Sequence, residues 1–392
     1  MRAGGFSVRV SFFYVAFFLL FGVQLPFFPV WLQSRGLDAG QIGLVSALPL
    51  LVRIFAVPVV TAAADRLGRS GPLIGACIAM TFASLVGLLF AFEFKAIVAL
   101  AILFAVAFTP LLPLMDALAT SGHRRGEAEY GRMRLWGSVS FILASLVGGT
   151  ALEAYSPDAV IWLLLGSTLL TGLAAIFLPS TATAADPATP RTSLLSDGAS
   201  LLLAPSFLLF LLASGLSMSS HAVLYTLGSV HWKHVGFDDG LIGTLWAVGV
   251  CAEIVLFALA GSLLRGTTGP ALILAGAIGG IVRWIVTAFD PPLAILFPMQ
   301  ILHAATFGLT HLGAMMFLQA AVPERLSRLG QGLYASLASG VFMSTAMYAS
   351  GYLYETYSGR AYLFMAGMSL AAMLAALALR RSWHGETLAA RN

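Results

Sequence analysis

Charged residues are scarce in this chain of 392 residues, at 10% of the total, and cysteine is scarcer still with two residues. Soluble domains carry about 25% charged residues, so the composition excludes a water-soluble enzyme, a disordered chain and a nucleic-acid-binding protein. Cys77 and Cys251 lie in apolar stretches, which favours neither a disulfide framework nor a cysteine-based metal site. Lys- and Arg-rich runs are also lacking, so the formal net charge of +4 does not indicate a nucleic-acid partner.

Long apolar runs are abundant instead, because 59% of the residues are hydrophobic. A helix needs about 20 mainly apolar residues to cross the ~30 Å hydrocarbon core of a bilayer. Twelve runs approach or exceed that length, and each predicts a membrane-spanning helix. They lie near 10–33, 40–63, 72–92, 96–119, 134–153, 159–178, 204–230, 240–262, 270–288, 293–319, 332–354 and 361–379.

A polar stretch rich in Pro, Thr and Ala, Ser180 to Asp197, separates the first six spans from the last six. We therefore predict an all-α membrane protein of two six-helix bundles, residues 1–179 and 204–392, joined by a cytoplasmic linker over 180–203. Most of the 21 Lys and Arg residues fall on the segments that share a side with the N-terminus. By the positive-inside rule, this bias predicts that both termini are cytoplasmic.

The two halves carry a related sequence. Gly36 to Gly43 (GLDAGQIG) recurs 200 residues later as Gly236 to Gly243 (GFDDGLIG), and Gly71-Pro72 recurs as Gly269-Pro270. Two matches at nearly the same offset indicate a duplication. Parallel six-helix repeats with a binding site between them at mid-membrane are typical of major facilitator transporters.

We consider five charged residues within the predicted spans, where each costs about 2.5–3.5 kcal/mol on insertion scales and usually faces a cavity or a partner. Arg53 and Glu253 occupy equivalent positions of the repeat, which predicts a charge pair across the halves; pairing of each within its own half is the alternative. The other three are Asp116, Arg134 and Arg283.

Glu253 is the best candidate for a proton carrier, with Arg283 as the charge that controls it. A low dielectric favours the neutral carboxyl and a nearby guanidinium favours the carboxylate, so relative motion of the two would switch proton affinity. A static buried pair is the alternative. His303 belongs to a polar stripe on its span with Gln300, Thr306, Thr310 and His311. It is interpreted either as a proton relay or substrate ligand, or as a hydrogen-bonded packing residue.

Candidate substrate-binding residues lie on several spans. Asp116 follows two prolines, and a contact with Arg134 across the hairpin would grip substrate or, alternatively, anchor the hairpin. Gln24 is a lone polar residue of the first span, and Trp136 offers a stacking surface unless it is an interfacial anchor. His311 is a further candidate, with packing as the alternative. The His and Glu spacing matches no metal-site or protease motif.

Several segments resemble known sequences. Asp65, Arg66, Gly68 and Arg69 resemble the loop signature of the major facilitator superfamily, although Thr61 and Ser70 stand where the signature has Gly and a basic residue. Five further segments resemble the phenylpropionate permease branch, which is similar to lactose permease and nucleoside–proton symporters. These segments are Leu25–Leu32, Pro113–Ala119, Tyr130–Ser138, His303–Gly308 and Gly330–Tyr334.

The resemblance covers essentially the whole chain and implies roles for individual residues. Glu253, Arg283 and His303 match the proton-carrying set of lactose permease, whose second acidic residue in span 10 is missing here. Asp116 and Arg134 resemble its substrate-binding acid and arginine, and the loop at Asp65 implies gating.

We therefore expect a bacterial inner-membrane proton symporter, working without a cofactor or metal as a monomer, whose partners are protons, lipid and a small-molecule substrate such as an aromatic carboxylate. The alternatives are a nucleoside or oligosaccharide symporter, a drug-efflux antiporter and, outside transport, a membrane sensor. An enzyme is not expected, because no clustered nucleophile–base or metal set is present, and a phosphate-cradling loop is lacking.

Overall fold

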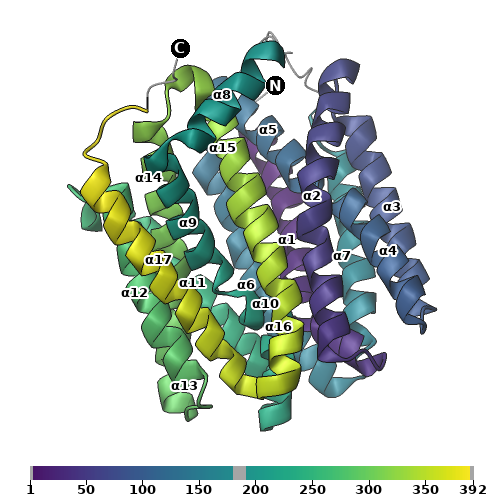
Figure 1. The fold of residues 1–392 in the computed structure, drawn as a ribbon. Coiled ribbons are helices and arrows are strands. Elements are labelled where there is room, and N and C mark those ends of the chain that lie inside the picture. The colour runs from purple at the N-terminus through teal and green to yellow at the C-terminus, as the bar shows by residue number, and fades with distance from the viewer. Residues whose placement is uncertain (1–2, 180–190, 389–392) are drawn as a thin grey trace. The chain divides into compact units, whose positions relative to one another are not determined.

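The computed structural model describes residues 3–179 and 191–388, which form helices and no strand (Figure 1). Eleven stretches of this part of the chain are long and apolar enough to cross a membrane. The last of them, Glu324–Ser382, is 59 residues long and contains both of the final two predicted spans. The predicted all-α fold with membrane-length helices is thereby confirmed.

The chain packs into two compact units. Unit 1 contains Met1–Asp186 and Gly228–Ala247, and unit 2 contains Pro187–Leu227 and Val248–Asn392. The domain limits predicted from the sequence follow the repeat rather than this packing, and they stay a prediction. Residues 180–190 of the predicted linker lie outside the described residues, whereas 191–203 form helix α8 (Arg191–Leu203).

In unit 1, α1 packs against α6 and α7, while α3 packs against α4 and α7, and α2 lies beside α4 (Figure 1). Gly22 of α1 allows the close approach to α6, because a Cβ there would lie 2.6 Å from the Phe141 carbonyl oxygen. The helices are α1 (Ala3–Ser34), α2 (Ala39–Leu67), α3 (Gly71–Leu89), α4 (Phe94–Phe108), α5 (Leu111–Arg124), α6 (Tyr130–Ala154) and α7 (Ala159–Ile176).

Aromatic rings fill the centre of unit 1. Phe17 and Phe108 stack with ring centroids 5.0 Å apart, and Phe104 stacks on Phe108 at the same distance. Because lipid tails are as apolar as these side chains, dispersion in close packing, not transfer out of water, holds such helices together within a bilayer.

The predicted fourth span bends where its prolines lie. Helix α4 ends at Phe108 and α5 begins at Leu111, so the interruption falls on Thr109 and Pro110. Proline has no N–H to donate to the preceding turn, and the bend sets the direction of α5, which carries Asp116.

The sequence repeat has the same backbone in both copies. Gly36 and Gly236 have φ values of +83° and +100°, which only glycine adopts without strain. Asp38 Oδ1 accepts a hydrogen bond from the Gln41 N–H, and Asp238 Oδ1 accepts one from the Leu241 N–H. Each copy therefore begins the following helix with the same aspartate cap, so the two copies share this turn geometry, and the duplication stays a prediction.

The start of α11 (Asp239–Leu263) packs tightly on α6 within unit 1. A Cβ on Gly149 would lie 2.3 Å from the Asp239 carbonyl oxygen, and one on Gly243 would lie 2.2 Å from that of Ser145. Small residues at such a crossing let two backbones approach more closely than any side chain permits.

In unit 2, α12 packs against α17, α14 and α9 (Figure 1). Phe210 of α9 stacks on Phe317 of α14 with centroids 4.4 Å apart. The elements are α9 (Pro205–Ser219), α12 (Gly269–Thr287), α13 (Leu293–Ile301), η1 (Ala304–Leu309), α14 (Thr310–Ala321), η2 (Glu324–Leu326), α15 (Ser327–Ser336), η3 (Leu337–Phe342), α16 (Met343–Tyr357), η4 (Ser358–Ala361) and α17 (Tyr362–Ser382). Helix α10 (Ala222–Val235) belongs to unit 2 up to Leu227 and to unit 1 from Gly228 on.

Three spans of unit 2 depart from regular α geometry, and the eleventh does so through the π-helical segment η3. The seventh is interrupted at Ser220 and His221, between α9 and α10. The tenth contains η1, a π-helical segment with an i→i+5 turn, directly after His303. Such wide turns are rare and occur frequently at functional sites.

Candidate functional site

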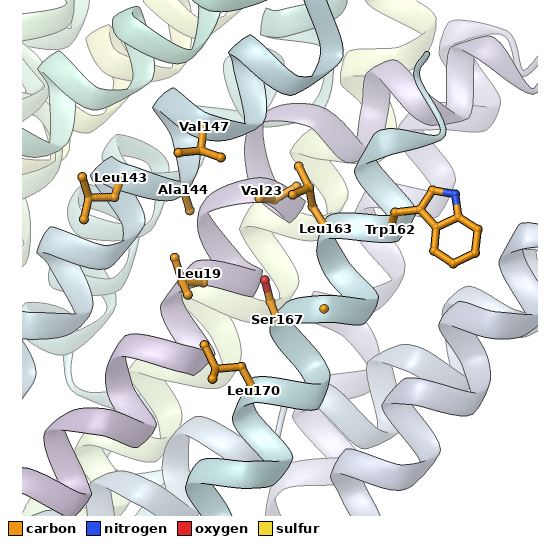
Figure 2. Close-up of a pocket in the computed structure, with 10 residues that line it drawn as sticks. Leu19, Val23, Leu143, Ala144, Val147, Trp162, Leu163, Ser167 and Leu170 are labelled. Carbon is orange, nitrogen blue, oxygen red and sulfur yellow. The ribbon is translucent and has the colours of Figure 1, made fainter. Parts of the chain in front are cut away.

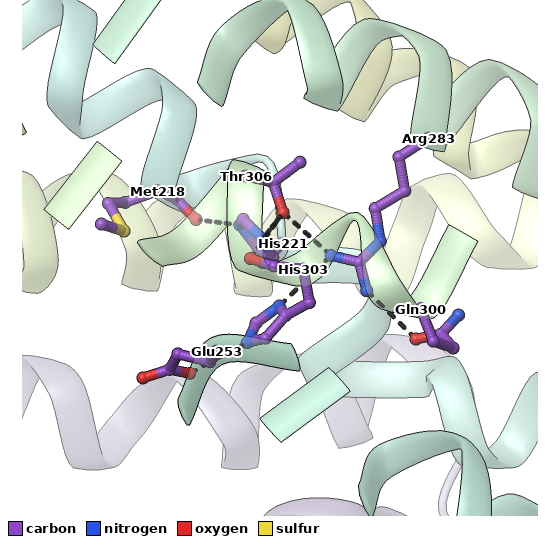
Figure 3. A network of polar contacts seen from close by, with 7 residues as sticks. All are labelled: Met218, His221, Glu253, Arg283, Gln300, His303 and Thr306. Carbon is purple, nitrogen blue, oxygen red and sulfur yellow. Dashed lines mark hydrogen bonds and ion pairs between the residues drawn. The ribbon is translucent and has the colours of Figure 1, made fainter. Parts of the chain in front are cut away.

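A buried guanidinium is the centre of a polar network in unit 2 (Figure 3). Arg283, on α12, is 1% exposed. Its Nη1 donates to His303 Nδ1 at 3.2 Å and to Thr306 Oγ1 at 3.0 Å, and its Nη2 donates to Gln300 Oε1 at 3.1 Å. Since an unpaired buried charge is very costly, these three acceptors explain how the cation is tolerated.

The imidazole of His303 lies between this cation and a carboxylate. Its Nε2 is 3.5 Å from Glu253 Oε2 on α11, at the opposite end of the ring from the nitrogen that meets Arg283. The side chain of Glu253 is 20% exposed and that of His303 is 11% exposed. The structure thus brings together the three residues predicted to couple protons, Glu253, Arg283 and His303.

The contacts also fix where the His303 proton lies. Arginine has donors and no acceptor, so the Nδ1 that meets Arg283 must be the bare nitrogen. The neutral ring then carries its hydrogen on Nε2, which faces the Glu253 carboxylate. The hydrogen bond made by one ring nitrogen of a histidine decides which of the two nitrogens carries the proton.

A second histidine completes the network. His221, at the interruption between α9 and α10, is fully buried. Its Nε2 lies 2.9 Å from Thr306 Oγ1, and its Nδ1 lies 3.0 Å from the Met218 carbonyl oxygen (Figure 3). Both ring nitrogens are therefore paired, and Thr306 links His221 to Arg283.

The polar cluster of unit 1 is built differently. Asp116 Oδ1 accepts hydrogen bonds from the hydroxyls of Tyr14 at 2.5 Å and Tyr130 at 3.2 Å. Within the described residues, no ion pair shorter than 4 Å joins Asp116 to Arg134. The Arg134 guanidinium instead lies 4.1 Å from the centroid of the Phe18 ring, in a cation–π contact.

The remaining substrate-binding candidates lie apart from these hydrogen bonds. Gln24 is half-buried on α1, and Trp136 is 55% exposed on α6. His311 is half-buried and stacks on Phe307 with centroids 6.1 Å apart, and Phe307 stacks in turn on His303 at 5.3 Å. His311 is thus connected to the network through one aromatic ring.

Arg53 and Glu253 lie in different units. Arg53 is exposed on α2 in unit 1, whereas Glu253 belongs to unit 2. Their pairing stays a prediction.

The loop that resembles a gating signature ends α2. Gly68 is the C-cap with φ +64°, and its N–H donates to the Asp65 carbonyl oxygen. Asp65, Arg66 and Arg69 are exposed. Gly68 thus ends α2 in the left-handed conformation that commonly terminates an α-helix, and the gating role stays a prediction.

An apolar cavity of about 280 Å³ lies between α1, α6 and α7 in unit 1 (Figure 2). None of the predicted substrate-binding residues lines it, and hydroxyl-bearing Ser167 is its main polar contributor besides the Trp162 ring. The lining residues are Leu19, Val23, Leu143, Ala144, Val147, Trp162, Leu163, Gly166, Ser167 and Leu170. This cavity is therefore separate from the two polar clusters.

Five polar residues of these clusters had no assigned role in the sequence interpretation: His221, Gln300, Thr306, Tyr14 and Tyr130. Thr306 was detectable, because it belongs to the polar stripe with Gln300 and His303, and all three bond to Arg283. Tyr14 carried no signal, since it meets Asp116 from 102 residues away. In the described part of the chain, no group of three His, Cys, Asp or Glu side chains is arranged to hold a metal ion.

Known proteins match this chain over almost its full length. The model of the MFS_1 like family matches residues 7–366. The "Probable 3-phenylpropionic acid transporter" of Escherichia coli is 32% identical, over 92% of this chain and 94% of that protein. The "Maltose permease" of Geobacillus stearothermophilus is 30% identical, over 94% of this chain and 93% of that protein.

A solved structure has the same fold. The crystal structure of the nucleoside transporter NupG matches with a TM-score of 0.82 at 16% identity, over 96% of this chain and 100% of that one.

The apolar helices and the matched relatives together define a multi-pass membrane transporter of the major facilitator type. The chain belongs to the MFS_1 like family. It is accordingly a transporter and not an enzyme.

Proposed function

We propose that this transporter is a proton-coupled symporter that imports a small organic solute, with Glu253, His303 and Arg283 as its proton-coupling residues. The observation that carries the proposal is the imidazole placed between a carboxylate and a guanidinium. With Glu253 ionised, its negative charge offsets the positive charge of Arg283 on the other side of the His303 ring. Protonation of Glu253 removes the anion, and the remaining positive charge of Arg283 then favours an anionic substrate through the low-dielectric interior. Proton and anion are thereby taken up together.

The proposed substrate is an aromatic carboxylate such as 3-phenylpropionate. The relative with that substrate in its name supports it, and so does Arg134, which lies over an aromatic ring and forms no ion pair with Asp116. A guanidinium binds a carboxylate through two parallel hydrogen bonds. Gln24, Asp116, Trp136 and His311 are the further proposed contacts.

Sugars and nucleosides are the competing substrates. The names of the maltose permease and of the nucleoside transporter favour them, and Asp116 is the residue that would accept hydrogen bonds from a hydroxyl-rich solute. A drug-efflux antiporter and a membrane sensor have no such support from the relatives named here.

The proposed cycle is a rocking of two six-helix bundles around one central site, in a bacterial inner membrane, with both termini cytoplasmic and the transporter a monomer. Arg53 is proposed to pair with Glu253 in one state of the cycle. Asp65, Arg66, Gly68 and Arg69 are proposed to form the gating loop. Support for the orientation comes from the distribution of Lys and Arg.

The experiment that tests proton coupling is the Glu253→Gln variant in proteoliposomes with an imposed pH gradient. We expect exchange of labelled 3-phenylpropionate to continue and uphill accumulation to be lost, because the amide cannot release a proton. Glu355→Gln, a change to an acidic residue of α16 outside both clusters, is the matched control. Normal accumulation by Glu253→Gln would refute the proton assignment.

The substrate class is tested separately by thermal shift of the purified protein with 3-phenylpropionate, maltose and uridine at the same concentrations. Stabilisation by the carboxylate alone supports the proposed substrate, since a ligand that binds only the folded state raises its stability. Stabilisation by maltose or uridine alone would replace it.

A further inference from the structure

His221 has no part in the proton-coupling set proposed above, yet it is fully buried inside the same network. It lies at the interruption of the seventh span, where the neighbouring Ser220 hydroxyl accepts a hydrogen bond from Trp284 Nε1 at 3.0 Å. The His221 ring packs edge-on against the Trp284 and His303 rings, at 5.1 and 5.5 Å between centroids. A residue enclosed in this way has a defined orientation.

Donor and acceptor types give the hydrogen bonds of this network a single direction. The Met218 carbonyl only accepts, so His221 Nδ1 carries the hydrogen and His221 Nε2 is bare. At the other end, Arg283 only donates, so Thr306 Oγ1 accepts from it. The Thr306 hydroxyl hydrogen is then left to point at His221 Nε2, 2.9 Å away.

This direction determines how Arg283 is held. The two hydrogens of its Nη1 go to Thr306 and His303. If the Thr306 hydroxyl lost its acceptor at His221, its hydrogen would keep only the His303 carbonyl, at 3.4 Å, and the Thr306 oxygen would no longer be held in line with the guanidinium. Arg283 would then no longer be fixed on His303 Nδ1, and His303 would be free to place its hydrogen on either nitrogen.

We infer that His221 is a positioning residue: through Thr306 it keeps Arg283 on His303 Nδ1, so that the His303 N–H faces Glu253. The inference rests on the proposed function, in which that N–H belongs to the proton-coupling set. His221 itself touches neither Glu253 nor, in the proposed scheme, the substrate.

The surroundings of His221 oppose its acting as a second proton carrier. The groups that face it are Arg283 of α12, His303 before η1 and Tyr225 of α10, with Glu253 of α11 on the far side of His303. With a proton on its Nε2, His221 would be a cation, and both His221 and Arg283 would then donate to Thr306 Oγ1. The Thr306 hydrogen would keep only the His303 carbonyl, at 3.4 Å. Both changes disfavour the charged ring.

Two pairs of variants test the inference. His221→Leu removes the acceptor at Nε2, whereas His221→Gln keeps an oxygen at that reach. Thr306→Val removes the hydroxyl, whereas Thr306→Ser keeps it. His234→Gln, at an exposed histidine near the end of α10, is the control for histidine replacement. The Thr306 pair keeps the test valid if His221→Leu does not fold.

The first readout is the nitrogen NMR spectrum of ¹⁵N-histidine-labelled full-length protein, with the His303 signal assigned from a His303→Gln sample. We expect a single Nε2–H tautomer at His303 in the wild type, His221→Gln, Thr306→Ser and His234→Gln, and a mixture of tautomers in His221→Leu and Thr306→Val. An unchanged Nε2–H tautomer in whichever of the latter two folds would overturn the inference.

The second readout compares uphill accumulation with exchange of 3-phenylpropionate across a series of pH values. In His221→Leu and Thr306→Val we expect accumulation to fall about tenfold, the effect of one lost hydrogen bond of ordinary strength, and its pH profile to shift, with exchange retained. Equal loss of both activities would indicate a merely structural role. A wild type that does not accumulate substrate would refute the proposed function, and the tautomer comparison would still decide how His221 acts on His303.

Discussion

The two polar clusters hold a carboxylate and an arginine by different means. In unit 1, Asp116 is bound by two phenol hydroxyls, and Arg134 lies over the Phe18 ring. In unit 2, an imidazole lies between Glu253 and Arg283. The first arrangement uses neutral O–H donors, whereas the second uses a ring that can donate from one nitrogen and accept at the other.

Under the proposed function, this difference corresponds to a division of tasks. Asp116 Oδ1 already accepts from two O–H donors, and Arg134 is proposed to bind the substrate. In unit 2, protonation of Glu253 would remove the anion that faces His303 Nε2. The proposed task of unit 1 is therefore substrate binding and that of unit 2 is proton coupling, and separate variants test each.

The largest effect is expected from Arg283→Met. Gln300, His303 and Thr306 would lose their common donor, and the charge opposite Glu253 would disappear. We expect uptake to fall by at least roughly 100-fold, equivalent to about 2.7 kcal/mol, in a proteoliposome assay. Arg283→Lys keeps a cation but not the planar guanidinium, so its uptake should lie between that of the wild type and that of Arg283→Met. Accumulation by Arg283→Met would show that unit 2 does not couple protons through this residue.

The next effect is expected from Arg134→Gln, which tests the binding task of unit 1. Loss of one charged hydrogen-bonding partner of a carboxylate, about 1.5–3 kcal/mol, should raise the KM for 3-phenylpropionate roughly 10- to 100-fold while the accumulation ratio at saturation stays the same. The neutral 3-phenylpropionamide is the matched ligand. Its weak competition with 3-phenylpropionate should be the same in the wild type and in Arg134→Gln. An equal loss for acid and amide would mean that Arg134 does not recognise the carboxylate.

A smaller effect is expected from Asp116→Asn. The amide oxygen still accepts from Tyr14 and Tyr130, at a cost of about 1 kcal/mol because the bonds lose their charge assistance. We expect a KM change of a few-fold and a normal accumulation ratio, in contrast to Glu253→Gln. If Asp116→Asn abolished accumulation while exchange continued, the division of tasks between the units would be wrong.

The smallest effect is expected from Glu127→Gln, outside both clusters. The hydrogen bond from Arg125, at 2.9 Å, and the attraction of its charge lower the pKa of Glu127. A lowered pKa in the folded protein stabilises the fold above the ordinary carboxyl pKa, and this contribution is lost as pH falls through the lowered value. Because the pair is exposed and screened, we expect unchanged uptake and thermal midpoint at pH 7. A change in uptake at pH 7 would place the α5–α6 loop in the mechanism.

Much of the fold was predictable from the sequence because the bilayer imposes it. Membrane-length apolar runs have few alternatives to helix, and the prolines at 110 and 113 marked the bend in the fourth span. The repeat of Gly36 to Gly43 was also readable, since a positive φ requires glycine. The interruption at Ser220 and His221 was not, because neither residue breaks helices by itself and contacts such as that from Trp284 accompany it.

The candidate site was predictable in part for similar reasons. Charges within spans are so costly that Glu253 and Arg283 stood out, and the polar stripe contained His303 and Thr306. The partners of Asp116 were not predictable, since Tyr14 reaches it from a distant helix. The direction of the hydrogen bonds through His221 was not predictable either, because it depends on whether each neighbouring atom is a donor or an acceptor.

Because η1 has a wide turn, the number of residues in this segment matters as much as their identity. An α-helix advances by about 100° per residue, so deleting one residue between Ala304 and Leu309 would restore a regular helix and swing everything after it around the axis. Thr310 would turn away from the Ser217 hydroxyl it now meets at 3.0 Å, even though no side chain of the network had been altered. Insertions and deletions here should therefore be far less tolerated than conservative replacements, a pattern that random mutagenesis with length variation would detect.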